Sequence, residues 1–224
     1  MKTKWLFLLL LLIAGYTTSA QVSLGVQGGV VRSNVSGDQS ELTFDTKPQS
    51  KFSWQAGLIA DIPLGESGFR FIPELKYVNK GFKANTTVDF LGQTTTIDGS
   101  SSIGYIELPI NFGYALDLGG VQLVLGAGPY LGYGIGGKNK FEAKVNGNVV
   151  QSIDEKVQFG SAEDEIKPFD YGANFLAGIL FGNGLMVKAN YGLGLANLSN
   201  VSNSTAKNNY LGLSLVYFVK RAGE

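Results

Sequence analysis

The chain contains eight segments in which apolar residues alternate with polar or small ones, and this periodicity most constrains its fold. The segments are residues 22–31, 52–62, 69–80, 103–116, 121–133, 169–181, 185–195 and 209–219. In residues 52–62, for example, Trp54 and Leu58 share one parity, and Gln55 and Asp61 share the other. Successive side chains of a β-strand point to opposite faces, so each segment is predicted to be a strand with one apolar face.

The length of these segments and the character of their second face favour a membrane barrel. Strands of globular proteins usually have about 5 to 6 residues, whereas a tilted strand crossing a bilayer needs about 9 to 11. The second face carries Gly, Asn, Gln, Lys, Glu and Asp. Such a face suits a polar lumen, with the apolar face turned toward lipid. A soluble lipocalin-like barrel is the alternative and requires the apolar faces to point inward.

The connections between the segments are alternately short and long. Short turns are predicted at residues 64–68, 117–120 and 183–184, and Asn183-Gly184 is a strong hairpin signal. Long loops are predicted at residues 33–51, 81–102, 134–168 and 197–208. Outer-membrane barrels have short periplasmic turns and long outside loops. We therefore predict an all-β fold, an eight-stranded antiparallel up-and-down transmembrane β-barrel with both termini in the periplasm.

The amino terminus resembles a secretory signal. Lys2 and Lys4 precede an apolar stretch at residues 5–14, and Thr18-Ser19-Ala20 fits a cleavage site. The apolar stretch is shorter than the roughly 20 residues of a membrane-spanning helix. We expect residues 1–20 to be a cleaved signal peptide and residues 21–224 to form one barrel domain in the outer membrane.

Several strands resemble a known family in order and spacing. Residues 105–110 read Tyr-Ile-Glu-Leu-Pro-Ile and resemble the "YxExP" strand of PorT-like outer-membrane barrel proteins, which are common in Bacteroidetes. Residues 126–132, 169–172 and 210–218 are similar to further strands of that family. The resemblance implies an integral outer-membrane protein of the eight-stranded type. The family's namesake belongs to a secretion machinery, a role that most relatives are not known to share.

Composition excludes several kinds of chemistry. The formal net charge is zero, so nothing favours binding to nucleic acid. The chain has no His and no Cys, which removes histidine-activated serine catalysis and the usual transition-metal ligands. Residues 132–138 read G-Y-G-I-G-G-K, but Asn139 replaces the Ser or Thr of a phosphate-binding loop. We expect no catalytic residues, no metal and no cofactor.

Charged residues on the polar face are the candidate site. They share the parity that points into the predicted lumen: Asp61, Arg70, Glu74, Lys76, Lys80, Glu107, Asp170 and Lys188. An eight-stranded barrel is just wide enough for side chains to fill its interior. The residues are therefore expected to form a polar network that plugs the lumen. An ion path or a small-ligand site is the alternative to a structural ionic core.

The long loops are the expected recognition surface, because binding often resides on loops held by a rigid scaffold. In residues 134–168, the stretches 141–150 and 149–157 partly alternate, which predicts a hairpin that extends the fifth and sixth strands. Its exposed edge could recruit an extracellular or secretion-machinery protein by strand addition. The leading hypothesis is a non-enzymatic outer-membrane protein that contacts lipid and recognises partners through its loops. A narrow channel or a secretion-machinery subunit is the alternative.

Overall fold

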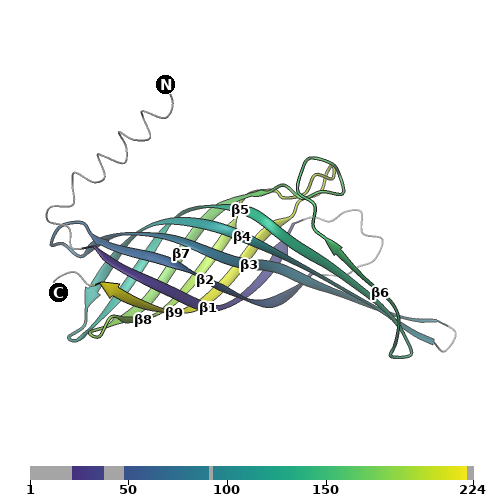
Figure 1. Cartoon of the computed structure of the whole chain (residues 1–224), viewed down its shortest axis with the longest axis horizontal. Helices are drawn as coiled ribbons and strands as arrows, with labels where there is room; N and C mark the ends of the chain where they lie inside the picture. Colours follow the sequence, from purple (N-terminus) through teal and green to yellow (C-terminus); the bar gives the residue numbers. More distant parts are fainter. Residues whose placement is uncertain (1–21, 38–47, 91–92, 221–224) are drawn as a thin grey trace, which may run out of the picture.

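The computed structural model describes residues 22–37, 48–90 and 93–220. Within these residues the chain forms nine β-strands (Figure 1). They are β1 Ser23–Ser36, β2 Gln49–Pro63, β3 Phe69–Phe90, β4 Gln93–Asp117, β5 Val121–Val145, β6 Asn148–Lys156, β7 Phe169–Phe181, β8 Leu185–Gly194 and β9 Lys207–Lys220. In the same ranges, no helix is long and apolar enough to cross a membrane. The predicted signal peptide lies outside the described residues.

Eight of the strands close into a ring. The sheet runs β4-β3-β2-β1-β9-β8-β7-β5, and an additional β4–β5 pairing joins its two edges. The pairs in the ring are antiparallel, and β1 and β9 pair from Leu24–Lys220 to Ser36–Lys207. Closure satisfies the hydrogen-bonding groups that an open sheet would expose to lipid. The predicted eight-stranded antiparallel barrel is confirmed.

The alternation seen in the sequence separates the two faces of the barrel wall. Outward side chains are apolar and exposed, as Trp54, Leu58 and Leu213 illustrate, whereas Gln55 and Asp61 are buried inside. A soluble barrel needs the reverse arrangement, because its apolar side chains must avoid water. The outward apolar face therefore contradicts the lipocalin-like alternative.

Two of the predicted long loops are largely strands, which corrects the sequence-based prediction. Residues 81–90 continue β3, residues 93–102 continue β4, and β5 runs on to Val145. The Thr-rich stretches of β3 and β4 lack a strong apolar face but pair directly, for example Thr87 with Thr96. β-branched threonines favour strands, and cross-strand pairs stabilise a sheet without a buried core.

The predicted hairpin exists, but its second strand is not an extension of a barrel strand. β5 turns at Asn146 and Gly147, whose φ angles of 51° and 82° suit a tight hairpin turn, and β6 then pairs with upper β5. The next barrel strand, β7, pairs only with lower β5, from Val121 to Tyr133. Strands β3 to β6 thus project as a four-stranded sheet beyond the barrel, at the end opposite the described chain ends (Figure 1).

The connections 157–168 and 195–206 bond to each other at the same end of the barrel. Lys167 donates its backbone N–H to the Leu198 carbonyl at 3.0 Å, and the Asn200 amide donates to the Gly160 and Glu165 carbonyls at 3.0 Å. The short connections 64–68, 118–120 and 182–184 lie at the other end, as predicted (Figure 1). By the general rule for these barrels, the short turns face the periplasm and the projecting sheet faces outward.

Candidate functional site

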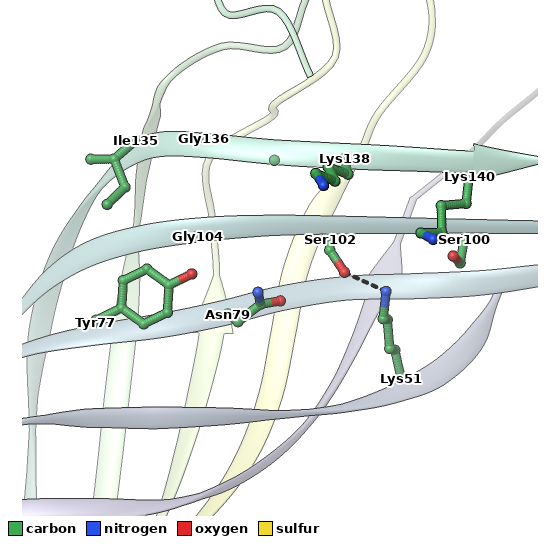
Figure 2. A pocket seen from close by; sticks show the side chains of 11 residues that line it. Lys51, Tyr77, Asn79, Ser100, Ser102, Gly104, Ile135, Gly136, Lys138 and Lys140 are labelled. Atoms are coloured by element: carbon green, nitrogen blue, oxygen red, sulfur yellow. Dashed lines mark hydrogen bonds between the residues drawn. The ribbon is translucent and has the colours of Figure 1, made fainter. Parts of the chain in front are cut away.

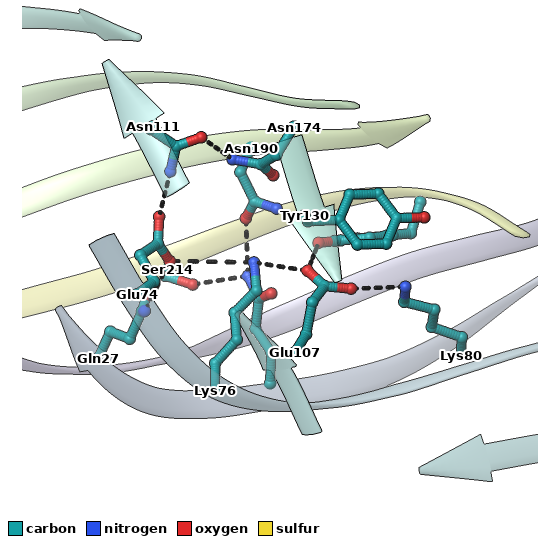
Figure 3. A network of polar contacts seen from close by, with 12 residues as sticks. Gln27, Glu74, Lys76, Lys80, Glu107, Asn111, Tyr130, Asn174, Asn190 and Ser214 are labelled. Carbon is teal, nitrogen blue, oxygen red and sulfur yellow. Dashed lines mark hydrogen bonds and ion pairs between the residues drawn. The ribbon is translucent and has the colours of Figure 1, made fainter. Parts of the chain in front are cut away.

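A continuous chain of alternating charges occupies the middle of the lumen (Figure 3). Lys188 Nζ lies 2.5 Å from Glu74, and Lys76 lies between Glu74 and Glu107 at 3.9 and 3.4 Å. Lys80 then bridges Glu107 at 2.6 Å and Asp170 at 2.9 Å. Three cations and three carboxylates therefore compensate one another. Their side chains are almost completely buried, so the pairs are poorly screened by water.

Uncharged polar side chains complete the hydrogen bonds of this network. Gln27 Nε2 donates to Glu74 at 2.8 Å, and Asn111 Nδ2 donates to the other oxygen of Glu74 at 3.3 Å. Asn208 and Tyr130 donate to Asp170 at 3.0 and 3.1 Å. A buried charge is best tolerated when it is paired and hydrogen-bonded, and these contacts provide both for Glu74 and Asp170. Among the described residues, Lys76 Nζ has ion pairs but no hydrogen-bond partner.

Three tyrosines surround the Lys80 ammonium group. Its Nζ lies 4.6 Å from the ring centroid of Tyr130, 4.7 Å from that of Tyr210 and 5.1 Å from that of Tyr105. Tyr210 also donates a hydrogen bond to Glu107. Cations are attracted to aromatic faces within about 6 Å of the centroid. The tyrosines therefore stabilise the cation and fill the remaining width of the lumen.

The eight predicted site residues point inward, but they form two groups. Six belong to the charge chain just described. The other two, Asp61 and Arg70, form a separate pair at 3.2 Å nearer the periplasmic end, where Arg70 also donates to Gln122 at 3.3 Å. The sequence placed these residues on the correct face but did not show which partner each one takes.

Two apolar clusters that sequence reasoning missed lie on either side of the charges. The periplasmic-side cluster consists of Ile59, Ile72, Val124, Leu176, Met186, Val216 and Phe218. The outer-side cluster consists of Val31, Val78, Ile103, Tyr105, Val157 and Tyr210, with Phe159 and Ile166 packed on it. Most of these residues lie at strand positions that point inward. Large apolar residues on the otherwise polar face were therefore the sequence signal for the two clusters. Along its length the lumen is therefore filled by an apolar cluster, then by the charge chain, and then by the second apolar cluster.

The arrangement leaves little room for substrate chemistry. Each carboxylate of the charge chain is engaged by a lysine, and no described group of three or more acidic side chains is placed to hold a metal ion. A reaction needs a concave site with a free nucleophile or base. The filled lumen is instead suited to holding the wall of the barrel together.

The projecting sheet is the second candidate site. Along β6 every residue is exposed, including Val149, Val150 and Ile153, and its outer edge has no partner strand among the described residues. Neighbouring β5 is fixed to β4 by a contact between Lys144 Nζ and Asp98 at 2.7 Å. That hydrogen bond raises the pKa of Lys144 above its ordinary value.

Comparison with known sequences decides the family. A family model described as the outer membrane protein beta-barrel domain matches residues 17–200. The chain belongs to this family. It is therefore an outer-membrane β-barrel protein whose apolar outer face contacts lipid. No curated protein sequence matches this outer-membrane protein significantly.

Solved structures of small outer-membrane barrels are weakly similar to this family member. Ail, the attachment invasion locus protein of Yersinia pestis, in complex with the heparin analogue sucrose octasulfate, is 15% identical, with 89% of this chain and 100% of Ail covered and a TM-score of 0.34. Neisserial surface protein A is 13% identical, with 88% and 98% covered and a TM-score of 0.37. OprG from Pseudomonas aeruginosa is 11% identical, with 90% and 98% covered and a TM-score of 0.40. No functional statement follows from similarities this weak.

Proposed function

We propose that this protein is a non-enzymatic outer-membrane barrel that recognises a protein partner through the sheet projecting from its outer end. The observation that carries the proposal is the exposed edge strand β6, which ends a four-stranded sheet beyond the barrel. An unpaired strand edge offers backbone N–H and C=O groups to an incoming strand. The charged residues Asp154, Glu155 and Lys156 at the end of β6 limit unspecific edge pairing, as charges do on natural edge strands.

The closed lumen supports a binding role over transport. The charge chain of six residues acts in this proposal as a structural ionic core, and the pair Asp61–Arg70 extends it toward the periplasm. Two apolar clusters close the lumen above and below. A conducting path would need continuous water along this axis.

The test is crosslinking in the native outer membrane followed by mass spectrometry. The variant replaces residues 142–152 with Asn-Gly, which preserves the register because Phe141 pairs with Ile153. Its control is the substitution Ser202→Ala at an exposed position of the other outer connection. We expect a specific partner to crosslink to the wild type and the control but not to the truncated variant. Equal capture by the truncated variant would contradict the proposal.

A narrow channel or a secretion-machinery subunit is the second candidate function. Steady conductance of the purified protein in planar bilayers would favour the channel. Co-purification with a secretion complex, dependent on β6, would identify the partner as that machinery. The buried Lys80–Glu107–Asp170 contacts lead us to expect no steady conductance.

We propose further that the chain is of the PorT-like type found in Bacteroidetes and is exported by a cleaved signal peptide at residues 1–20. The Tyr-Ile-Glu-Leu-Pro strand at residues 105–109 and the Ser19-Ala20-Gln21 junction support this assignment. Amino-terminal sequencing of the protein from outer membranes should begin at Gln21. A start at Met1 would contradict cleavage.

A further inference from the structure

A basic cavity lies on the outward face of the barrel wall, outside the lumen. It has a volume of about 390 Å³ and lies over the outer parts of β3, β4 and β5 (Figure 2). Its polar lining includes Lys51, Lys138 and Lys140 together with Ser100 and Ser102. No carboxylate lines it among the described residues. The cavity therefore presents three lysine side chains, of which Lys140 is paired with Asp154, and two serine hydroxyl groups to its occupant.

Local departures from regular strand structure form this cavity. The β4–β5 register shifts between Gly104 and Tyr105, so that Ile135 is an extra residue on β5. Such a bulge redirects side chains and opens the wall locally. The Tyr77 ring fills the space above Gly104, because a Cβ at Gly104 would lie 2.4 Å from the Tyr77 hydroxyl. Tyr77 and Ile135 thus give the cavity an apolar lower wall.

Two of the three lysines have no carboxylate partner among the described residues. Lys51 donates to the Ser101 carbonyl at 3.3 Å and to the Ser102 hydroxyl, both on β4. Within the described part of the chain Lys138 forms no ion pair, whereas Lys140 pairs with Asp154 of β6 at 3.2 Å. Lys138 lies opposite Lys156 of β6, so its direct cross-strand neighbour adds a positive charge and not a negative one. Lysine charges gathered in this way are compensated best by an anion from outside the chain.

The strand register shows how far the lysines lie from the row of aromatic residues that marks the membrane boundary. Tyr77, Ile106 and Tyr133 form one outward row across β3, β4 and β5, and Trp54 packs on Tyr77 with ring centroids 4.7 Å apart. Tyrosine and tryptophan gather at the membrane–water interface of such barrels. This row therefore indicates the outer edge of the apolar band.

The basic residues begin above that row. Ser102 and Lys138 pair in a row further out, where β3 contributes Gly81, four residues beyond Tyr77. Four residues of a strand span about 13 Å, which a tilt of about 45° reduces to about 9 Å of height. The lysines therefore lie at the level of lipid head groups. A carboxylate first appears opposite Lys140, where Asp154 pairs with it, and two more follow further out, where Asp98 lies opposite Glu142.

We propose that this cavity binds the phosphorylated head group of a lipid in the outer leaflet. The phosphate lies among Lys51, Lys138 and Lys140 and accepts hydrogen bonds from the serine hydroxyls, while the lipid chains descend along Tyr77 and Ile135. Lipid rather than a soluble anion is favoured, because the cavity opens on the outward face and its lower wall continues the lipid-facing apolar band. The resulting contact anchors the projecting sheet at a fixed height above the membrane.

The test measures binding of diphosphorylated lipid A to the full-length protein in detergent micelles by native mass spectrometry. Dephosphorylated lipid A and a soluble sulfated oligosaccharide are the comparison ligands. The variant K51Q/K138Q removes the two lysines that have no carboxylate partner among the described residues, and K167Q/K207Q is the charge-matched control outside the cavity. We expect the affinity for diphosphorylated lipid A to fall roughly tenfold or more in K51Q/K138Q, because each hydrogen bond to a charged group contributes to the binding free energy. In the control the affinity should change by at most about twofold.

A second variant tests the same cavity by a different change, so that the proposal can still be tested if K51Q/K138Q does not fold. Ser102→Glu places a negative charge in the cavity and should weaken binding as strongly, while both variants keep the mobility shift of an unboiled barrel on a gel. Equal binding by K51Q/K138Q and its control would overturn the proposal. So would equal binding of the dephosphorylated lipid, or a sulfated oligosaccharide bound as tightly as lipid A at the same lysines, which would assign the cavity to soluble polyanions.

Discussion

At the residue scale, stability inside this barrel depends on pairing every buried charge. Glu107 is the centre of the chain, because it forms ion pairs with Lys76 and Lys80 and accepts a hydrogen bond from the Tyr210 hydroxyl. Removing one member of a buried ionic group leaves its partner uncompensated, which costs far more than losing an exposed ion pair. The same type of contact thus has very different energetic weight in the lumen and on the projecting sheet.

Glu107→Gln should therefore destabilise the folded barrel by about 3–5 kcal/mol, because the isosteric amide keeps a hydrogen-bond acceptor but leaves an excess positive charge in the lumen. Asp154→Asn, which breaks the exposed pair with Lys140, should cost about 0–1 kcal/mol. Urea unfolding of the protein refolded in phospholipid vesicles measures both. Similar losses for the two variants would contradict a structural role for the ionic core.

Gly192 is required because the Tyr210 ring lies against its backbone. A Cβ at this position would lie 2.0 Å from Tyr210 Cε1, whereas a Cβ at outward-facing Gly28 would meet nothing within 4 Å. Gly192→Ala should displace the ring from Lys80 and Glu107 and cost about 1–3 kcal/mol, as overpacking does. Gly28→Ala should leave the free energy of unfolding nearly unchanged. The same unfolding assay compares the two variants. An unchanged free energy of unfolding for Gly192→Ala would contradict the predicted clash with the Tyr210 ring.

At the scale of elements, β3, β4 and β5 are longer than a membrane crossing requires. Each has 22 to 25 residues, against 10 in β8. Their outer parts combine with β6 into the projecting sheet, while the following connection packs Val157 and Phe159 on the outer apolar cluster. The hairpin and the connection that follows it are therefore consecutive in sequence, but the hairpin belongs to the projecting sheet and the connection packs on the lumen of the barrel.

This division predicts opposite effects of two nearby changes. Replacing residues 142–152 with Asn-Gly should leave the urea midpoint of the barrel almost unchanged, because β6 is exposed along its whole length. Replacing Val157 and Phe159 together with Ser should cost about 2–4 kcal/mol, because apolar contacts of the outer cluster are lost. A large loss of stability in the hairpin variant would show that the projecting sheet and the barrel fold as one unit.

At the scale of the whole molecule, the wall of the barrel has an apolar outer face and a polar inner face. A lipid bilayer is the surrounding in which both faces are stable. Phe52, Leu211 and Val219 are among many large apolar residues that are more than half exposed on the outside. An apolar surface of this extent would be strongly unfavourable in water but is favourable against lipid chains. The ionic interior is then shielded from lipid by the same wall.

Trp54 provides a direct measurement of this orientation. The sequence has two tryptophans, and a mature protein that starts at Gln21 keeps only Trp54, which lies outward on β2 and serves as the reporter. Its fluorescence should be quenched strongly by brominated lipid in reconstituted vesicles and weakly by aqueous iodide. A parallel measurement on Trp54→Phe gives the background. Strong quenching by iodide alone would contradict contact between this face and lipid.

The sequence by itself determined the class of fold, because a period of two residues over long segments admits few structures other than strands with distinct faces. Residues 169–181 were predicted with the boundaries that β7 has, and the periplasmic turns were located by their Gly and Asn residues. The inward direction of Glu74, Lys80 and Asp170 also follows from parity alone.

Only the tertiary structure decided the rest, because those features depend on which strands become neighbours. The order Lys188–Glu74–Lys76–Glu107–Lys80–Asp170 joins four strands, β3, β4, β7 and β8, and cannot be read from any one of them. The outer parts of β3 and β4 have weak apolar patterns and become strands because they pair with each other and with β5. The basic cavity likewise exists only where a bulge in β5 brings lysines of distant segments together. Local periodicity fixes the face of a side chain, whereas closure of the ring fixes its partner.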